Sequence, residues 1–223
     1  MLRWPVVLFD LDGTLADTVD LIVASYDHAL QEVLAVSMSR NEVRTWIGRP
    51  LHDAIIDTFP TQADRVDEVV TAYRRWNLAH HDEMIQRVPG MDLLLTELAT
   101  AGAAMGVVTS KLNETAARGL KAVGLDGAIE IVAGQDQTNK HKPHPEPLLY
   151  AARILGVDPA DCVYVGDATV DLQAAHAAGM ASIGVTWGAG ERANLEAEVP
   201  AAVVDDVDDL TAVLWAKPAP TDA

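Results

Sequence analysis

Short apolar runs and longer stretches with helical spacing alternate along most of this chain. Runs of three to five residues rich in β-branched side chains predict buried strands, whereas apolar residues that recur every three or four positions predict helices. The elements predicted after residue 88 are helix 93–101, strand 105–108, helix 113–123, strand 129–133, helix 146–155, strand 162–165, helix 170–178, strands 181–185 and 202–204, and helix 208–215. With a first strand at 5–9, this alternation predicts an α/β fold, a parallel sheet covered by helices on both faces.

Residues 19–86 interrupt that alternation, because they show helical patterns and no strand. Ser39 stands three residues before Glu42, which is the pattern of a capping box at the start of a short helix. We therefore expect a helical domain inserted into the first strand–helix crossover of an α/β core. The predicted divisions are a core at 1–17 and 88–216, a helical cap at 18–87 and a flexible tail at 217–223.

Composition narrows the class of protein. The 223 residues include 16 Lys and Arg against 33 Asp and Glu, for a net charge of −17, and they contain no basic block to neutralise nucleic-acid phosphates. No apolar run approaches the ~18 residues of a membrane helix, and the N-terminus lacks a signal-peptide layout. The single cysteine, Cys162, excludes an intrachain disulfide and is typical of a reducing compartment. We therefore expect a cytoplasmic protein with neither a nucleic-acid nor a membrane partner.

Polar residues follow the predicted strands at the points where the strands end. They form four clusters: Asp10 with Asp12, Thr109 with Ser110 and Lys111, Lys142, and Asp167 with Asp171. In open α/β sheets, ligands bind beyond the carboxyl ends of the strands, so clusters that are distant in sequence can converge there. Each cluster taken alone is typical of a turn or a helix cap. The four together, in this order, indicate a catalytic site.

The residue types indicate phosphate chemistry. Asp10 and Asp12 are two positions apart and can face the same side, so that one attacks a phosphorus centre while the other transfers a proton. Close carboxylates repel each other, and Mg²⁺, which prefers oxygen ligands, relieves that repulsion. Asp167 is placed to complete such a metal site, and Asp171, four residues later on the same helical face, to support it.

The remaining clusters offer groups for a phosphate. Thr109 supplies a hydroxyl, and Ser110 precedes a predicted helix whose N-terminal N–H groups attract a phosphate. Lys142, held in a loop by Pro143, can offset the charge of the nucleophile and of the transferring group.

Segments 10–17, 109–111, 142–147 and 166–171 together resemble the four motifs of the haloacid dehalogenase superfamily. The resemblance covers nearly the whole chain and implies a Rossmann-like, doubly wound core with an inserted helical cap of the C1 type. It implies that Asp10 forms an aspartyl-phosphate and that Asp12 acts first as general acid and then as base. It further implies that Asp10, the main-chain carbonyl of Asp12, and Asp167 hold Mg²⁺. Thr109 and Lys142 are implied to bind the phosphoryl group.

Within that superfamily, two features favour a phosphatase. Dehalogenases lack an acid at the position of Asp12, because a halide leaves without a proton. The phosphosugar mutases carry a histidine in the first cap linker, where this chain has Asp20-Leu21-Ile22-Val23. This difference disfavours a phosphosugar mutase, which we keep as the alternative function. A receiver-type, phospho-accepting signalling module is a less favoured alternative. In receivers the phosphorylated Asp follows the third strand, and here a helical cap follows the acidic pair of the first strand.

The cap sequence narrows the expected substrate. Segment 46–53 resembles the cap loop of phosphoglycolate phosphatases and, more closely, that of bacterial pyrophosphatases, and segment 73–83 resembles the cap helix of the pyrophosphatases. The resemblance implies a small anionic phosphate compound, with pyrophosphate slightly ahead of 2-phosphoglycolate. We expect Gly48, Arg49, His80 and His81 to bind its leaving group. A small phosphorylated substrate is the expected partner, and a monomer or homodimer is the expected assembly.

Overall fold

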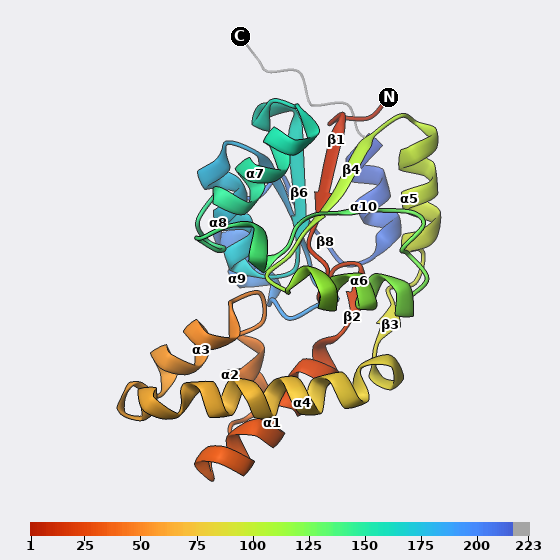
Figure 1. The fold of residues 1–223 in the computed structure, drawn as a ribbon. Helices are drawn as coiled ribbons and strands as arrows, with labels where there is room; N and C mark the ends of the chain where they lie inside the picture. Colours follow the sequence, from red (N-terminus) through yellow and green to blue (C-terminus); the bar gives the residue numbers. More distant parts are fainter. Residues whose placement is uncertain (216–223) are drawn as a thin grey trace.

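The computed structural model describes residues 1–215, and the tail predicted at 217–223 lies outside the described residues. Six parallel strands form the main sheet in the order β5-β4-β1-β6-β7-β8. Their bounds are β1 (Val6–Phe9), β4 (Ala104–Val108), β5 (Ile131–Ala133), β6 (Cys162–Gly166), β7 (Ala181–Val185) and β8 (Ala202–Val204). The predicted α/β fold is therefore confirmed, with β1 in the interior of the sheet (Figure 1).

Helices cover both faces of the sheet, because successive strand side chains point in opposite directions. The helices of the core are α5 (Met91–Thr100), α6 (Asn113–Ala122), α7 (Glu146–Leu155), α8 (Thr169–Ala178), α9 (Arg192–Ala197) and α10 (Val207–Trp215). Val7 and Phe9 of β1 pack in one apolar cluster with residues of α5, α6 and α10. Val6 and Leu8 pack in another with residues of α7 and α8. The continuous apolar run of β1 reflects this burial on both sides.

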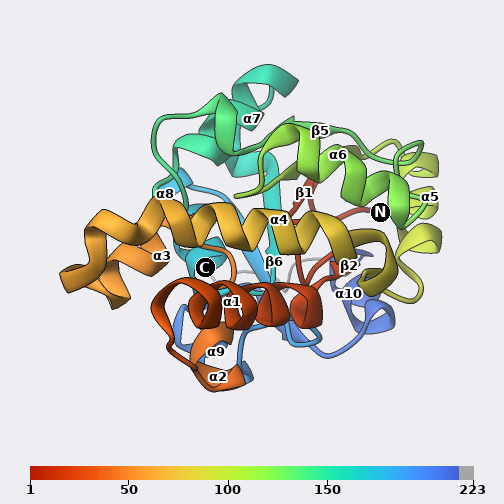
Figure 2. The ribbon, with the colours of Figure 1, turned by 60° about the horizontal axis from the view of Figure 1, so that its bottom comes forward.

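A helical cap lies beyond the carboxyl ends of the strands (Figure 1). Its helices are α1 (Val19–Leu34), α2 (Arg40–Arg44), α3 (Leu51–Thr58) and α4 (Val66–Met84), with a 3₁₀ turn at Pro60–Arg65. Figure 2 shows α1 and α4 running side by side across the end of the core. The cap has its own apolar cluster, which includes Tyr26, Trp46 and Tyr73. The capping box predicted at Ser39 and Glu42 is present at the start of α2.

Two chain crossings join the cap to the core. Strands β2 (Ala16–Asp17) and β3 (Gln86–Arg87) pair in an antiparallel ribbon, which sequence patterning did not predict. The domain boundaries predicted after residues 17 and 87 lie at this ribbon. Three further elements differ from prediction. The helical pattern expected through residue 86 ends at Met84, where α4 stops. The strand predicted at 129–133 covers only Ile131–Ala133, and α9 was not predicted. No helix within residues 1–215 is long and apolar enough to cross a membrane.

Candidate active site

The predicted polar residues meet at the carboxyl end of the sheet. Asp10 directly follows β1, Thr109 follows β4 and Asp167 follows β6. Lys142 enters from the loop before α7, and Asp171 lies in the first turn of α8. All five side chains are buried, although they are charged or polar. A parallel sheet produces this convergence because its strands end at one edge.

Lys142 forms the centre of the buried network. Its Nζ lies 3.0 Å from Oδ1 of Asp10 and 2.6 Å from Oδ1 of Asp171, and it donates to the hydroxyl oxygen of Tyr164 at 3.0 Å. The Tyr164 hydroxyl donates in turn to the carbonyl oxygen of Val108, at 2.7 Å. These three contacts use all three donors of the ammonium group. Lys142 therefore acts directly on Asp10, and contact with a phosphoryl oxygen requires it to release one of these partners.

Three buried carboxylates lie close to one another at this site, and two of them, Asp10 and Asp171, contact Lys142. Asp10, Asp167 and Asp171 each offer an oxygen atom, and these atoms lie within 4.8 Å of one another. Oδ2 of Asp167 accepts a hydrogen bond from the backbone N–H of Ala189 at 2.6 Å, whereas its Oδ1 has no partner within residues 1–215. A Cβ on Gly13, where φ is 73°, would lie 2.2 Å from Oδ2 of Asp167. Glycine there leaves room for the carboxylate.

The charges in this cluster do not balance. Burial raises the pKa of Asp10 to about 7; Lys142 opposes that shift, and the nearby Asp171 and Asp12 carboxylates add to it. Burial, with Asp171 and Asp10, also holds the pKa of Asp167 well above its usual range. Burial alone lowers the pKa of Lys142, but the adjacent Asp10 and Asp171 raise it well above its ordinary value.

A divalent cation fits this arrangement. One ammonium group faces three buried carboxylates, and the free Oδ1 of Asp167 is an oxygen ligand without a partner in the described part of the chain. Mg²⁺ is commonly held by one or two carboxylates, with waters and phosphate oxygens as its other ligands. Asp171 is already bonded to Lys142, and its other oxygen accepts from the backbone N–H of Ala168, at 3.0 Å. It is therefore better placed to hold Lys142 than to bind the metal.

Asp12 lies apart from the carboxylate cluster. Its Oδ1 is ion-paired with the Nζ of Lys111, and both residues line a cavity of about 490 Å³ between the core and the cap. Asp10 and Thr109 line the same cavity, whereas Lys142, Asp167 and Asp171 do not. The cavity therefore gives access to the predicted nucleophile and to the predicted proton donor together.

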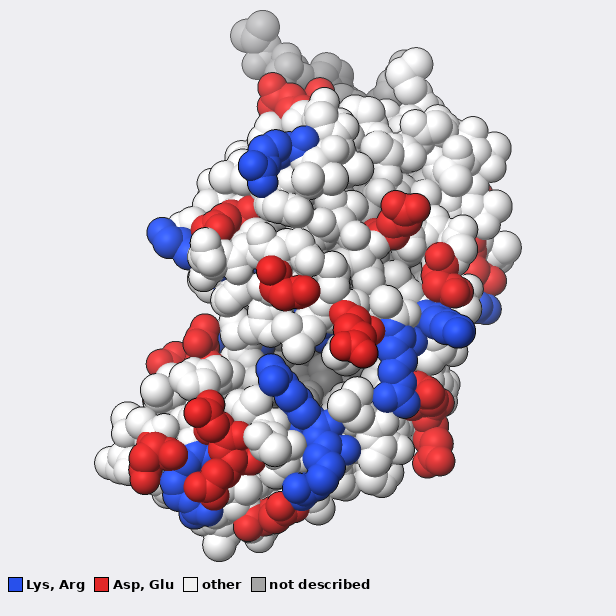
Figure 3. Space-filling model, in the orientation of Figure 1, with Lys and Arg blue, Asp and Glu red and all other residues white. Residues whose placement is uncertain are grey.

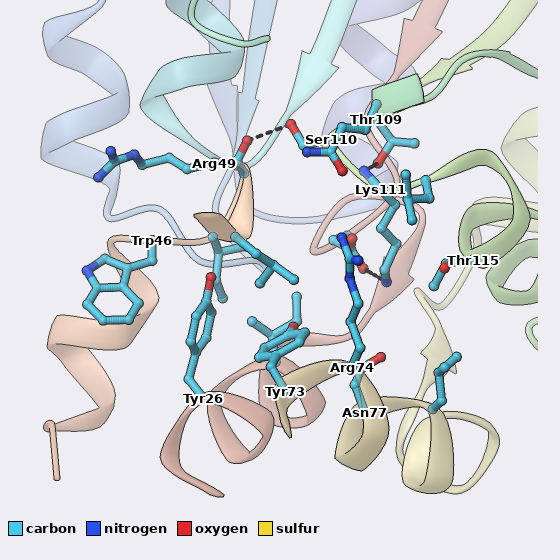
Figure 4. A pocket seen from close by; sticks show the side chains of 18 of the residues that line it. Tyr26, Trp46, Arg49, Tyr73, Arg74, Asn77, Thr109, Ser110, Lys111 and Thr115 are labelled. Atoms are coloured by element: carbon cyan, nitrogen blue, oxygen red, sulfur yellow. Dashed lines mark hydrogen bonds and ion pairs between the residues drawn. The ribbon is translucent and has the colours of Figure 1, made fainter. Parts of the chain in front are cut away.

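The cap forms the opposite wall of the cavity. Figure 4 shows Tyr26, Trp46 and Tyr73 around it, with Ser110 and Lys111 on the core side. The Ser110 hydroxyl donates to the carbonyl oxygen of Gly48, at 2.8 Å, and so joins the core to the cap. Figure 3 shows the hollow between the core and the cap, and the Lys and Arg side chains that border it. The cavity therefore combines an aromatic wall with a basic rim.

The cap residues predicted to bind substrate are placed differently from expectation. Gly48 and Arg49 line the cavity, but the Arg49 guanidinium pairs with Asp57 and points away from the cavity centre (Figure 4). The other two, His80 and His81, do not line it.

Local packing explains where the two histidines go. His80 stacks on Trp76, with ring centroids 4.0 Å apart. His81 is buried, and its Nδ1 lies 2.7 Å from Oδ1 of Asp82. The structure therefore does not bring either histidine to the cavity between the core and the cap.

Tyr164 and Arg74 are among the residues at the site that were not predicted. Tyr164 binds Lys142, and the only signal in the sequence was a hydroxyl-bearing residue within an apolar strand. Arg74 lines the cavity from α4, and Figure 4 shows its side chain rising into the cavity. The one sequence feature that could have indicated Arg74 is its position one helical turn before Asn77, another polar residue that lines the cavity.

The chain is similar to known proteins over most of its length. The family model for haloacid dehalogenase-like hydrolases matches residues 7–185. The chain is 37% identical over 208 residues to the pyrophosphatase PpaX of Bacillus mycoides, a match that covers 93% of the chain and 95% of that relative. It is 35% identical over 215 residues to PpaX of Bacillus velezensis, which covers 96% of the chain and 98% of that relative.

Solved structures also resemble this chain over more than nine-tenths of its length. A haloacid dehalogenase-like hydrolase from Bacteroides fragilis superposes with a TM-score of 0.86 at 27% identity, covering 93% of this chain and 100% of that one. A structure described as a predicted phosphoglycolate phosphatase from Haemophilus somnus superposes with a TM-score of 0.80 at 30% identity, covering 94% of this chain and 97% of that one. The similarity thus extends over the core and the cap together.

Proposed function

The chain belongs to the haloacid dehalogenase-like hydrolase family, and on this premise we propose that it is a Mg²⁺-dependent phosphohydrolase for a small anionic phosphate compound. The observation that carries the proposal is the buried Asp10 carboxylate, bonded to Lys142 and open to a cavity that Asp12 and Thr109 also line. Inorganic pyrophosphate and 2-phosphoglycolate are the proposed substrates. The relatives named pyrophosphatase and the structure described as a phosphoglycolate phosphatase support these two.

In the first step, an oxygen of Asp10 attacks the phosphorus atom and the bond from phosphorus to the leaving-group oxygen breaks. Lys142 keeps Asp10 in position and offsets its charge through the 3.0 Å contact. Asp12, on the cavity side, donates a proton to the departing oxygen. The products of this step are an aspartyl-phosphate on Asp10 and the protonated leaving group.

In the second step, a water molecule attacks the phosphorus atom of the aspartyl-phosphate. Asp12, now ionised, accepts the proton of that water. The bond from phosphorus to Asp10 breaks, which releases inorganic phosphate and regenerates both carboxyl groups. Thr109, buried at the cavity edge, is placed to donate its hydroxyl to a phosphoryl oxygen in both steps.

Asp10, Asp167 and the main-chain carbonyl of Asp12 are the groups that we propose hold Mg²⁺. When bound there, the cation supplies charge neutralisation between the carboxylates and the phosphoryl oxygens. Asp171 positions Lys142, since its two oxygens are occupied by that lysine and by the N-terminal backbone of α8.

A substrate panel tests this function. Purified protein with Mg²⁺ is assayed for phosphate release from pyrophosphate, 2-phosphoglycolate, a hexose phosphate and a nucleoside monophosphate. We expect kcat/KM for pyrophosphate or 2-phosphoglycolate to exceed the others by tenfold or more. Bisphosphate-dependent isomerisation of the hexose phosphate without net hydrolysis would instead identify a phosphosugar mutase. A single, slowly decaying phosphorylation without turnover would identify a phospho-accepting module.

A further inference from the structure

Four basic residues line the cavity between the core and the cap, and three of them are already paired with carboxylates. They are Arg49, Arg74, Lys111 and Arg118. Arg49 pairs with Asp57, Lys111 pairs with Asp12, and Arg118 contacts both oxygens of Asp82 at 3.1 Å. Within residues 1–215, Arg74 forms no ion pair and no side-chain hydrogen bond. Among the described cavity residues, it is the cation that remains available to an anion.

The backbone that carries Arg74 is firmly held, although its side chain is free. Tyr73, the preceding residue, packs against Tyr26 of α1 with ring centroids 4.7 Å apart. Asn77, one turn later, donates from Nδ2 to the hydroxyl of Ser25 at 3.0 Å, and both residues are buried. These contacts fix the face that α4 turns toward the cavity. Figure 4 shows Arg74 extending from that face into the cavity, on the side where Lys111 lies.

The surroundings of Arg74 favour an anionic ligand. The cap side of the cavity consists largely of apolar and aromatic side chains, including Tyr26, Tyr73 and Leu78, whereas the acidic residues that line the cavity, Asp10, Asp12 and Glu114, come from the core. The apolar and aromatic groups offer no negative charge, and a guanidinium presents several donors in a planar fork that matches a carboxylate or a phosphate. The chain as a whole carries a net charge of −17, so an unpaired cation facing the cavity is a local exception.

We propose that Arg74 is the specificity-determining residue of this enzyme and that it binds an anionic group on the leaving group of the substrate. The inference rests on the proposed function, since it assumes that the phosphoryl group is transferred to Asp10 at the core side of the cavity. The second phosphate of pyrophosphate and the carboxylate of 2-phosphoglycolate are both anions of the required kind. Arg49, which the sequence predicted to bind the leaving group, is ion-paired with Asp57. In this proposal Arg74 binds the leaving group instead.

The test compares Arg74→Met with Arg75→Met. Arg75 is the next residue on α4, but its guanidinium contacts Glu32 at 2.5 and 2.6 Å and does not line the cavity. Each variant loses one arginine from the same helix, so Arg75→Met is a matched control for helix stability and net charge. A third variant, Arg74→Lys, keeps the charge but not the planar fork.

The measurement is kcat/KM for pyrophosphate, 2-phosphoglycolate and phenyl phosphate, whose leaving group carries no second anion. We expect wild-type enzyme to prefer the two anionic substrates over phenyl phosphate. In Arg74→Met, that preference should fall about 10- to 100-fold, as is typical for loss of a hydrogen bond to a charged group. Arg74→Lys should restore part of it, and Arg75→Met should leave it within about twofold.

The outcomes separate this inference from the function on which it rests. If wild-type enzyme hydrolyses phenyl phosphate as well as the anionic substrates, or if Arg74→Met leaves the preference unchanged, the role of Arg74 is refuted while the phosphohydrolase stands. An equal loss on all three substrates in Arg74→Met also refutes it, since the residue would then act on the shared phosphoryl group. If wild-type enzyme releases phosphate from none of the three, the proposed function fails and this inference fails with it.

Discussion

Replacing Asp10 with Asn should make the metal-free protein more stable at alkaline pH, although it removes the proposed nucleophile. Asp10 is 2% exposed and shares its surroundings with Asp171 and Asp12. Within residues 1–215 its only cation partner is Lys142, at 3.0 Å, and burial raises the pKa of Asp10 to about 7. Asparagine has nearly the same shape and can remain beside Lys142, but it never ionises. The difference between variant and wild type therefore measures how much unfolding free energy the protein loses when the buried carboxylate is ionised.

The magnitude follows from proton linkage. The folded-state pKa of Asp10 lies above its ordinary value of 3.8, so the folded protein holds this proton to higher pH than the unfolded chain does. Stability from this group is present below about pH 4 and is lost as pH rises through about 7. Three pH units at ~1.4 kcal/mol each amount to about 4 kcal/mol lost by pH 8. At pH 5 only about a third of that is lost, because about one of the three pH units has been crossed.

Thermal unfolding in EDTA at pH 5 and pH 8 measures this difference. For a chain of this size, 1 kcal/mol corresponds to ~2–4 °C in Tm, so Asp10→Asn should gain about 8–16 °C over wild type at pH 8. At pH 5 the gain should shrink to about 3–6 °C. Excess Mg²⁺ should narrow the gap at pH 8, because the ion binds and stabilises the wild-type carboxylates more strongly. A variant with equal or lower Tm at pH 8, or a gain independent of pH, would refute the reasoning.

Three further outcomes follow from the site. Exhaustive chelation should abolish phosphate release and Mg²⁺ should restore it, with Ca²⁺ a poor substitute because its coordination is looser; full activity after chelation contradicts the metal proposal. Asp12→Asn should lower kcat by about 10²-fold or more, measured as steady-state phosphate release, and a wild-type kcat would exclude Asp12 as general acid. Lys142→Met should cost about 3–5 kcal/mol of unfolding free energy by urea titration at pH 8, because the buried Asp10 and Asp171 carboxylates lose their cation. A change below about 1 kcal/mol would show that the lysine does not hold the cluster.

The core of the site is predictable because its signals are local. Asp10, Thr109 and Asp167 each follow a recognisable strand directly, and the rule that parallel strands end at one edge brings them together. The sheet and its covering helices are predictable for the same reason, since apolar periodicity is read within a few residues. The individual roles of these residues remain predictions.

The unpredicted parts depend on contacts between distant segments. Tyr164 of β6 accepts from Lys142, which enters from a distant loop, and donates to the carbonyl oxygen of Val108 on β4. The choice between Arg49 and Arg74 depends on Asp57 holding the first, and on how packing of Tyr26 against Tyr73 orients α4. No local pattern in the sequence encodes those orientations.

The shortest elements escaped prediction for a related reason. Strands β2 and β3 have two residues each, which is too few for an apolar period, and their pairing joins Ala16 to Arg87 across the whole cap. Helix α9 has six residues, which is less than two full turns. Such segments are stabilised by what they pack against rather than by their own composition.

The most direct test of the central claim is to trap the phosphorylated enzyme. Asp12→Asn is mixed with Mg²⁺ and ³²P-labelled pyrophosphate, quenched in acid, digested and analysed by peptide mass spectrometry. The account predicts label on the peptide that contains Asp10, its release by hydroxylamine as expected for an acyl phosphate, and no label when Asp10 is also replaced by Asn. Phosphate release by an Asp10→Asn single variant at the wild-type rate, with no labelled peptide, would contradict the assignment of Asp10 as nucleophile.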